Sequence, residues 1–174
     1  AVESGDFTLE AWCWFDDPDE DEDRFIYTNF ASWGANAFLF GKHSATAAGD
    51  GKVVFWVNNN NASAPLLVDP NMPSAGWIHY CVTRSGNTFT LYRNGSSVAT
   101  ATSFTGAVTG SSNISYVGEA GDGIASFKGY LRDVRLIKGT AVTPPSGGPS
   151  EPLTAVTNTG LLTCHLPYIA DGST

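Results

Sequence analysis

Hydrophobic and polar residues alternate along most of this chain with a period of two. In FTLEAWCWF (7–15), every second residue from Phe7 to Phe15 is apolar, while Thr8, Glu10 and two tryptophans stand between them. Successive side chains of a strand point to opposite faces, so this alternation predicts a strand with its odd-numbered residues in a core. The run KVVFWV (52–57) is apolar throughout, which predicts a strand that is covered on both faces.

Tight turns separate the predicted strands. The stretch 77–102 predicts three strands joined by Ser85-Gly86-Asn87 and by Asn94-Gly95, and the second turn needs positive φ at both centres. Further strands are predicted at 25–30, 113–118, 127–139 and 161–166. Helical periodicity is nearly absent. About eleven strands with regular turns predict an all-β fold, an antiparallel two-sheet β-sandwich.

The strand predicted at 127–139 also alternates in its residue types. A regular strand places one set of side chains on one face and the other set on the opposite face. We expect Tyr130, Arg132, Val134 and Leu136 to share a face, opposite Leu131, Asp133, Arg135 and Ile137.

Composition changes after the last of these strands. TPPSGGPSEP (143–152) contains four prolines and two glycines, a composition typical of an extended linker. The sequence therefore predicts a sandwich over 1–142, a linker over 143–152 and a tail over 153–174. The tail contributes one strand, which packs on the same or on a neighbouring sandwich.

Charge narrows the classes of partner. The net charge is −8, which argues against nucleic acid or an anionic membrane surface, since both need a basic face. No apolar run approaches the ~18 residues that a membrane span needs. The three cysteines lack metal-site spacing, and we expect Cys13 and Cys81 to be small buried hydrophobes. The chain starts at Ala1 and its only methionine is Met72, so we expect a processed chain or an excerpt.

Four segments together resemble a known family. They are GDFTLEAWCWF, GWIHYCVTRSGNTFTLYRNGSSVA, YVGEAGDGIASFKGYLRDVRLIKGTAV and PLTAVTNTGLLTCHL. Their order and spacing resemble a laminin-G-like domain of the concanavalin-A-like lectin/glucanase superfamily. The resemblance implies a jelly-roll sandwich, a Ca²⁺ ion at the rim of one sheet, and rim loops that recognise glycans or protein surfaces.

The segment from Lys138 through 143–152 to LLTCHL resembles a narrower group, the tandem laminin-G-like modules of mostly marine phage virion proteins. This implies a binding or structural module on a virion or tail fibre, made in the host cytoplasm. Its partners would be a glycan, a host-surface receptor or other virion subunits, with self-association open. The alternative is an extracellular lectin-like adhesin of a cell.

One edge of the family sheet is unaccounted for. Members usually have a strand before the F-T-x-E strand, and only six residues precede Phe7. An unpaired edge invites pairing with another strand. We expect the tail strand 161–166 to fill this edge, with a neighbouring chain as the alternative.

A glycoside hydrolase is the minor alternative, because the superfamily includes such enzymes. Retaining hydrolysis needs two carboxylates about 5 Å apart across a cleft. Glu10 is the single acid on its strand, and His79 has the sequence context of a packed residue rather than a base. We therefore predict that the chain is not an enzyme.

Seven of the eight residues in DDPDEDED (16–23) are acidic. Calcium takes six to eight oxygen ligands, and alternate Asp side chains can wrap one ion. Candidate ligands are Asp17, Asp19, Asp21, Asp23, Asp122 and Asp133. A solvated acidic loop without a bound ion explains the same residues and is the interpretation that we favour, with cation binding second.

Sugar binding needs an exposed aromatic ring flanked by amide or carboxylate groups. Trp33, with Asn29 and Asn36 nearby, is the first candidate, and Trp56 with Asn58 is the second. Core packing is the alternative for each tryptophan. Trp12 and Trp77 correspond to framework positions of the family, which implies a structural role.

Overall fold

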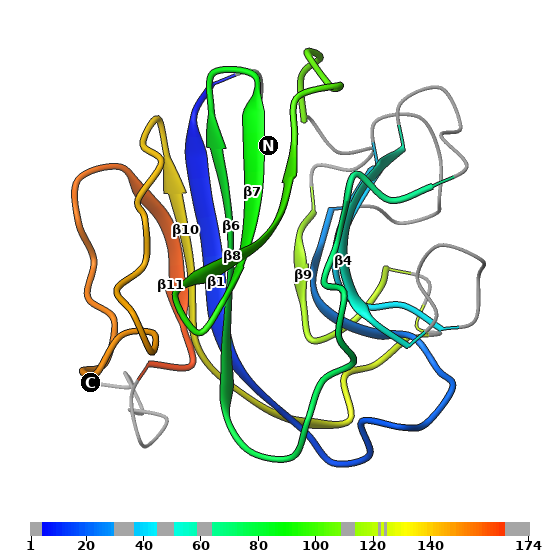
Figure 1. The fold of residues 1–174 in the computed structure, drawn as a ribbon. Coiled ribbons are helices and arrows are strands. Elements are labelled where there is room, and N and C mark those ends of the chain that lie inside the picture. The colour runs from blue at the N-terminus through cyan, green and yellow to red at the C-terminus, as the bar shows by residue number, and fades with distance from the viewer. Residues whose placement is uncertain are drawn as a thin grey trace.

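The computed structural model describes residues 5–29, 37–44, 51–58, 64–108, 114–121, 123 and 125–165. Two antiparallel sheets face each other across a shared core (Figure 1). The sequence prediction of an all-β, two-sheet sandwich is confirmed. Within the described ranges, no helix has the length and apolar character that crossing a bilayer would require.

The sheets have six and five strands. The six-stranded sheet runs in the spatial order β11 (Thr159–Thr163), β10 (Gly129–Lys138), β1 (Phe7–Phe15), β6 (Ile78–Ser85), β7 (Thr88–Arg93) and β8 (Ser96–Ala101). The five-stranded sheet runs β5 (Leu67–Val68), β4 (Val53–Asn58), β3 (Ala37–Lys42), β2 (Arg24–Thr28) and β9 (Tyr116–Val117).

The core lies between the sheets and follows the predicted alternation. The odd-numbered residues of β1, from Phe7 to Phe15, are all buried in it, together with Phe89 from β7 of the same sheet and Phe38 and Phe55 from the facing sheet. On β4 the residues alternate between this core and a second cluster that holds Val54 and Trp56, so the strand is covered on both faces as predicted. Asn94 and Gly95 have φ of 49° and 75°, as their turn requires.

The faces predicted for the side chains of β10 are wrong from Asp133 onward. Arg132 pairs with Trp12 and Arg135 pairs with Glu10, so two residues of β10, Asp133 and Val134, lie opposite the single residue Ala11 of β1. Asp133 sits at this β-bulge with φ of 54°, in the left-handed region that few side chains adopt. The extra residue reverses the faces. Arg132 precedes the bulge and points out, whereas Val134 follows it and points into the core.

β11 lies in the same sheet as β10 and forms its edge. β1 is paired on both sides, by β10 and by β6, so the tail strand completes the sheet one position away from β1. β11 begins at Thr159, two residues before the predicted start.

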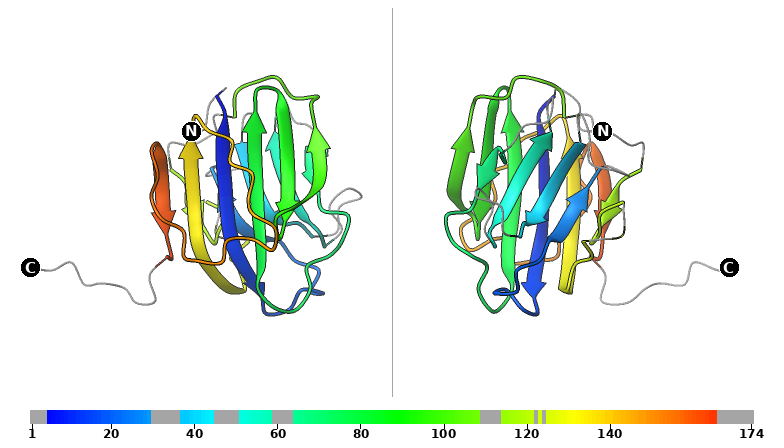
Figure 2. Two further views of the ribbon diagram at one scale, coloured as in Figure 1. Left: turned by 60° about the vertical axis from the view of Figure 1, so that its left-hand side comes forward. Right: turned by 90° about the vertical axis from the view of Figure 1, so that its right-hand side faces the viewer.

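Residues 140–158 cross the outer face of the six-stranded sheet, and we call this segment the strap (Figure 2). It contains the predicted linker 143–152. Its start is held at Thr8, whose Oγ1 donates to the carbonyl of Thr140 and accepts from the backbone N–H of Val142. Further along, the N–H of Gly147 donates to the carbonyl of Asn94 in the β7–β8 turn. The division into domains at this segment stays a prediction.

Candidate functional site

The outer face of the six-stranded sheet carries side chains in rows across β10, β1 and β6. Directly opposed residues of an antiparallel pair leave the sheet on the same face. The register sets Tyr130 opposite Trp14, and Trp77 precedes β6 beside them. We call these three residues the aromatic row. The next row holds Arg132, Trp12 and His79, whose pairing follows the same register.

The aromatic row is exposed. Trp14 is 36 %, Trp77 39 % and Tyr130 62 % accessible to solvent. The rings of Trp14 and Trp77 meet edge to face with centroids 6.1 Å apart. Large aromatic side chains that gather on a surface mark an interaction site more often than isolated ones do. This row is therefore a candidate contact surface.

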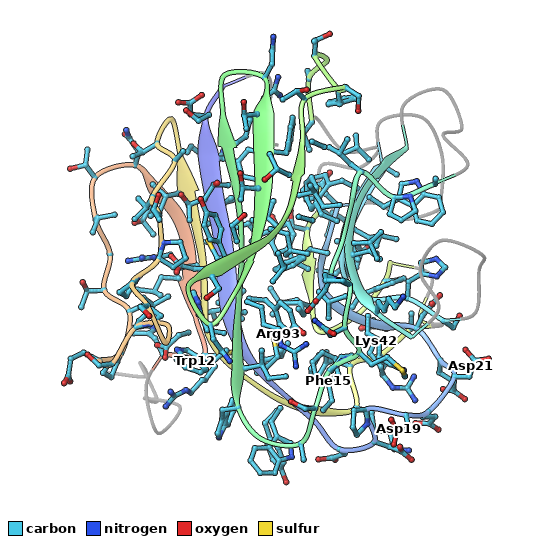
Figure 3. The ribbon with its side chains drawn as sticks, viewed as in Figure 1. Trp12, Phe15, Asp19, Asp21, Lys42 and Arg93 are labelled. Carbon is cyan, nitrogen blue, oxygen red and sulfur yellow. The ribbon has the colours of Figure 1, made fainter. Side chains whose placement is uncertain are left out.

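Arg132 joins the aromatic row to the row behind it. Its guanidinium carbon lies 5.0 Å from the ring centroid of Trp12 and 5.2 Å from that of Trp77. Both distances are in the range of cation–π attraction. Figure 3 shows Trp12 on the outer side of the sheet and Phe15 between the two sheets. The bulge at Asp133 permits this placement, because it allows Arg132 and Arg135 both to point outward.

Behind the aromatic row lies a buried ionic cluster of Glu10, His79 and Arg135. Arg135 donates to Glu10 Oε1 through Nε at 2.9 Å and Nη2 at 2.6 Å. His79 Nε2 lies 3.1 Å from Glu10 Oε2. All three residues are buried. Burial alone raises the pKa of Glu10, but the hydrogen bond from His79 and the charge of Arg135 outweigh it, and the pKa is lowered overall.

The strap covers this ionic cluster. Arg135 Nη1 donates to the carbonyl of Thr154 at 2.9 Å. Gly148 packs so closely that a Cβ there would lie 2.8 Å from His79 Cβ and 2.9 Å from Trp12 Cζ2. Thus the strap closes the ionic cluster from solvent but leaves the aromatic row uncovered.

The chemistry available to Glu10 is limited by this arrangement. Both of its oxygens accept hydrogen bonds from cationic or imidazole groups, and its side chain has no open face toward solvent. A general acid or a nucleophile must instead reach a substrate atom. Among the described residues, Glu10 is therefore a structural ion-pair partner, and His79 is a packed residue as predicted.

The acidic stretch 16–23 is bound by the chain's own cations. Glu20 accepts from Arg24 at 2.7 Å and from Lys128 at 2.9 Å, and both contacts lower its pKa. The buried Lys42 donates to the backbone carbonyl of Glu20. Asp23 Oδ1 accepts from the N–H of Ser44 at 2.7 Å. The stretch is therefore anchored at its C-terminal half and solvated elsewhere.

The predicted calcium ligands are not brought together. Asp17, Asp19 and Asp21 are exposed, and Figure 3 shows Asp19 and Asp21 on the opposite side of the sandwich from Trp12. Asp133 is buried at the bulge, where its Oδ1 accepts from the strap N–H of Leu153 at 3.1 Å. Asp122 lies outside the described residues.

These positions give an ion no ready set of ligands. Within the described ranges, no three acidic, histidine or cysteine side chains converge as metal ligands do. The calcium site stays a prediction.

The predicted sugar ligands fall partly outside the described residues, because Trp33, Asn36 and the side chain of Asn58 are among those not described. Asn29 is buried, and its Nδ2 donates to Ser115 Oγ at 2.8 Å. Trp56 is buried with its ring centroid 5.3 Å from that of His43. Core packing therefore explains Trp56, and the rim site at Trp33 stays a prediction.

The aromatic row was not identified from the sequence. Trp12 is buried, as a framework residue should be, but Trp77 was interpreted in the same way and is exposed. A signal was present in Trp14, which alternation assigns to the outward face of its strand. Its neighbours Tyr130 and Trp77 could be linked to it only through the register of β10 and β6.

Three solved structures share this fold. A protein of Bacteroides ovatus ATCC 8483, provisionally described as carbohydrate-binding, has a TM-score of 0.61 and 19 % identity, covering 81 % of this chain and 39 % of its own. Domain 4 of AbnA, a GH43 extracellular arabinanase from Geobacillus stearothermophilus solved with arabinotriose, has a TM-score of 0.59 and 14 % identity, covering 82 % and 65 %. A heptameric SAP-like pentraxin from Limulus polyphemus has a TM-score of 0.50 and 18 % identity, covering 79 % and 65 %.

The chain thus spans between 39 % and 65 % of the length of these three proteins. Among curated proteins, none is similar enough to be counted as a relative. A family model described as the concanavalin A-like lectin/glucanases superfamily matches residues 1–145, which is most of the chain. The chain belongs to the concanavalin A-like lectin/glucanase superfamily, as a laminin-G-like domain.

Proposed function

We propose that this chain is a non-enzymatic carbohydrate-binding module and that the aromatic row is its sugar-contacting surface. The observation that carries the proposal is the exposure of Trp14, Trp77 and Tyr130 side by side on one sheet face. Sugar rings present C–H faces that stack on aromatic rings, while their hydroxyls bond to polar groups beside them. Because adjacent strands lie about 4.8 Å apart, the row offers a run of rings across three strands.

The carbohydrate descriptions of two structural neighbours support this choice. One of them is a domain of an extracellular enzyme, and an extracellular setting is part of the proposal for this chain. The finer setting, a virion or tail-fibre surface, is supported only by the resemblance of residues 138–166 to phage modules. A module that faces a host glycan from such a surface would use the aromatic row in the same way.

Binding to polysaccharides tests the proposal. The purified chain is applied to a glycan microarray and to affinity electrophoresis in gels that contain soluble arabinan, β-glucan or pectin. We expect retention by at least one polymer and its loss in Trp14→Ala. Trp14→Phe should keep much of the retention, since it keeps an aromatic face. Met72→Ala is the matched control, because Met72 is exposed and lies outside the row.

The predicted rim site is tested alongside. If Trp33→Ala abolishes retention while Trp14→Ala leaves it unchanged, the sugar site lies at the rim and not on the aromatic row. Repeating the wild-type gels with a calcium chelator tests the calcium proposal. Release of reducing ends from any polymer would contradict the non-enzymatic part.

Exposed Trp, Tyr and Arg are also the residues that dominate protein interfaces. A structural subunit would bury the aromatic row against a neighbour. Light scattering distinguishes this second function: self-association that Trp14→Ala abolishes, without binding to any glycan, would favour a subunit contact over a sugar site.

A further inference from the structure

We propose that the aromatic row selects acidic glycans, in which Arg132 binds a sugar carboxylate or sulfate while the rings of the row stack on the sugar. This inference rests on the proposed function and adds the chemical class of its ligand. It follows from how the arginines of the chain are used, from how Arg132 is held, and from the charge around it.

Four of the five arginines donate hydrogen bonds within the protein. Arg24 bonds to Glu20 and to a carbonyl, and Arg84 donates to the carbonyls of Gly86 and Gly106. Arg93 bonds to Asp69, Met72 and Ser74, and Arg135 bonds to Glu10 and Thr154. In contrast, no described residue accepts a hydrogen bond from Arg132, whose side chain is 49 % exposed. None of its five N–H donors has an acceptor among the described residues.

The guanidinium of Arg132 is nevertheless held in place. Its carbon lies 5.0 Å from the ring centroid of Trp12 and 5.2 Å from that of Trp77, so two rings contact it. Trp12 is itself buried and packs closely against Gly148 of the strap. A planar fork of donors that is already oriented loses little entropy when it binds a carboxylate or sulfate through two hydrogen bonds.

The one acidic partner of Arg132 among the described residues is Asp133, and their ion pair is long. The nearest carboxylate oxygen is Asp133 Oδ2, at 3.8 Å from Arg132 Nε, which is beyond hydrogen-bond range. The other oxygen of Asp133 accepts from the strap at Leu153. The terminal nitrogens of Arg132 therefore remain available beside Trp77 in the exposed row.

The net negative charge of the chain opposes non-specific binding of acidic polymers. With a net charge of −8, the chain repels polyanions at long range. An acidic glycan is held only where a local cation and stacking rings act together. A neutral glycan would use the rings alone and leave the Arg132 donors to water.

Matched pairs of polymers test the inference. Polygalacturonate is compared with its methyl ester, and dextran sulfate with dextran, by affinity electrophoresis and isothermal titration calorimetry. The first pair differs in a carboxylate and the second in a sulfate, so the two pairs tell the acid groups apart. We expect at least one acidic member to bind about tenfold or more tighter than its neutral partner, as suits a charged hydrogen-bonded pair.

Arg132→Gln should remove this preference, so that the acidic and neutral members of each pair bind equally. Arg132→Lys should keep part of it, since an ammonium retains the charge but lacks the planar fork. Lys138→Gln is the control, because it removes the same charge from an exposed position at the other end of β10. That variant should bind like the wild type.

The outcomes separate the two proposals. Equal binding of acidic and neutral members, unaffected by Arg132→Gln, would overturn the acidic preference and leave a neutral sugar-binding module. An equal loss in Arg132→Gln and Lys138→Gln would also overturn it, because the effect would then be one of net charge. Wild-type chain that binds none of these polymers or the microarray glycans would overturn both the preference and the proposed function.

Discussion

Two arginines three positions apart on β10 show how differently one sheet face can be used. Arg135 is buried under the strap and donates three hydrogen bonds, two of them to Glu10. Arg132 is half exposed, stacked on two tryptophans and without a hydrogen-bond acceptor among the described residues. Both point away from the core, and the strap decides which of them meets solvent.

The difference teaches that burial and not residue type separates a structural charge from an available one. A buried arginine must be paired, because leaving its charge without a partner in a low dielectric costs several kcal/mol. The exposed arginine is solvated and can exchange water for a ligand. The bulge at Asp133 makes the comparison possible, since a regular strand would point Arg132 and Arg135 to opposite faces.

Removing the anion of the ionic cluster is expected to give the largest loss of stability. Glu10→Ala leaves Arg135 and His79 buried without their carboxylate. The free energy of unfolding should fall by about 3–5 kcal/mol, the range found when one partner of a buried ion pair is removed. Urea denaturation followed by tryptophan fluorescence measures it.

A double replacement controls this result. Glu10→Leu/Arg135→Met exchanges the pair for apolar groups of similar size, which is often neutral for a buried pair. It should recover at least half of the loss seen in Glu10→Ala. A double variant that is as unstable as the single one would mean that packing of the Glu10 stem, and not the unpaired charge, explains the loss.

Two adjacent glycines test how tightly the strap packs on the sheet. Gly147 and Gly148 both have φ of 84°, but a Cβ at Gly147 meets nothing within 4 Å, while one at Gly148 meets His79 and Trp12 below 3 Å. Alanine carries the same backbone penalty at either position. Gly148→Ala should therefore cost about 1–3 kcal/mol more than Gly147→Ala, from overpacking alone.

Thermal or urea unfolding of both variants measures this difference. Equal stability of Gly147→Ala and Gly148→Ala would show that the strap can move away from Trp12 without a loss of stability. The contrast between the strap-covered ionic cluster and the exposed aromatic row would then weaken.

Much of the fold could be predicted from the sequence because its signals are local. Alternation from Phe7 to Phe15 identified the buried face of β1, and the pair Asn94-Gly95 identified the turn between β7 and β8. The bulge at Asp133 could not be predicted, since no glycine marks it and the residue types on both sides alternate as in a regular strand. The strap also gave no sign of packing, because its prolines and glycines are equally typical of a free segment.

The candidate site depends on contacts between distant parts of the chain. Trp14 and Tyr130 become neighbours only through the pairing of β1 with β10, which a single sequence does not specify. The partners of the acidic stretch depend on distant contacts in the same way: Lys42 and Lys128, which bind it, come from other segments of the chain.

The ionic cluster should also give a pH signature. The pKa of Glu10 is lowered from its ordinary value of 4.5, so its contribution to stability is complete above that value and is lost as the pH falls through the folded-state pKa. We expect the stability gap between wild type and Glu10→Gln to be constant from pH 7 to about pH 5 and to narrow in more acidic buffer. Urea titrations at each pH measure the gap, and the other carboxylates cancel because both proteins share them. A gap that widens toward acid would contradict the lowered pKa.

The smallest effect on stability is expected at the exposed end of the same face. Tyr130→Thr keeps a residue type that favours strands and removes a ring that is 62 % exposed, so unfolding should change by no more than about 0.5 kcal/mol. Sugar binding should nevertheless weaken several-fold, because a stacking surface is lost from the aromatic row. Measuring urea stability and polysaccharide retention on one preparation separates these effects. A variant that loses stability like Gly148→Ala would show that Tyr130 belongs to the packed half of the face, and the aromatic row would then be a structural edge rather than a surface free to meet a ligand.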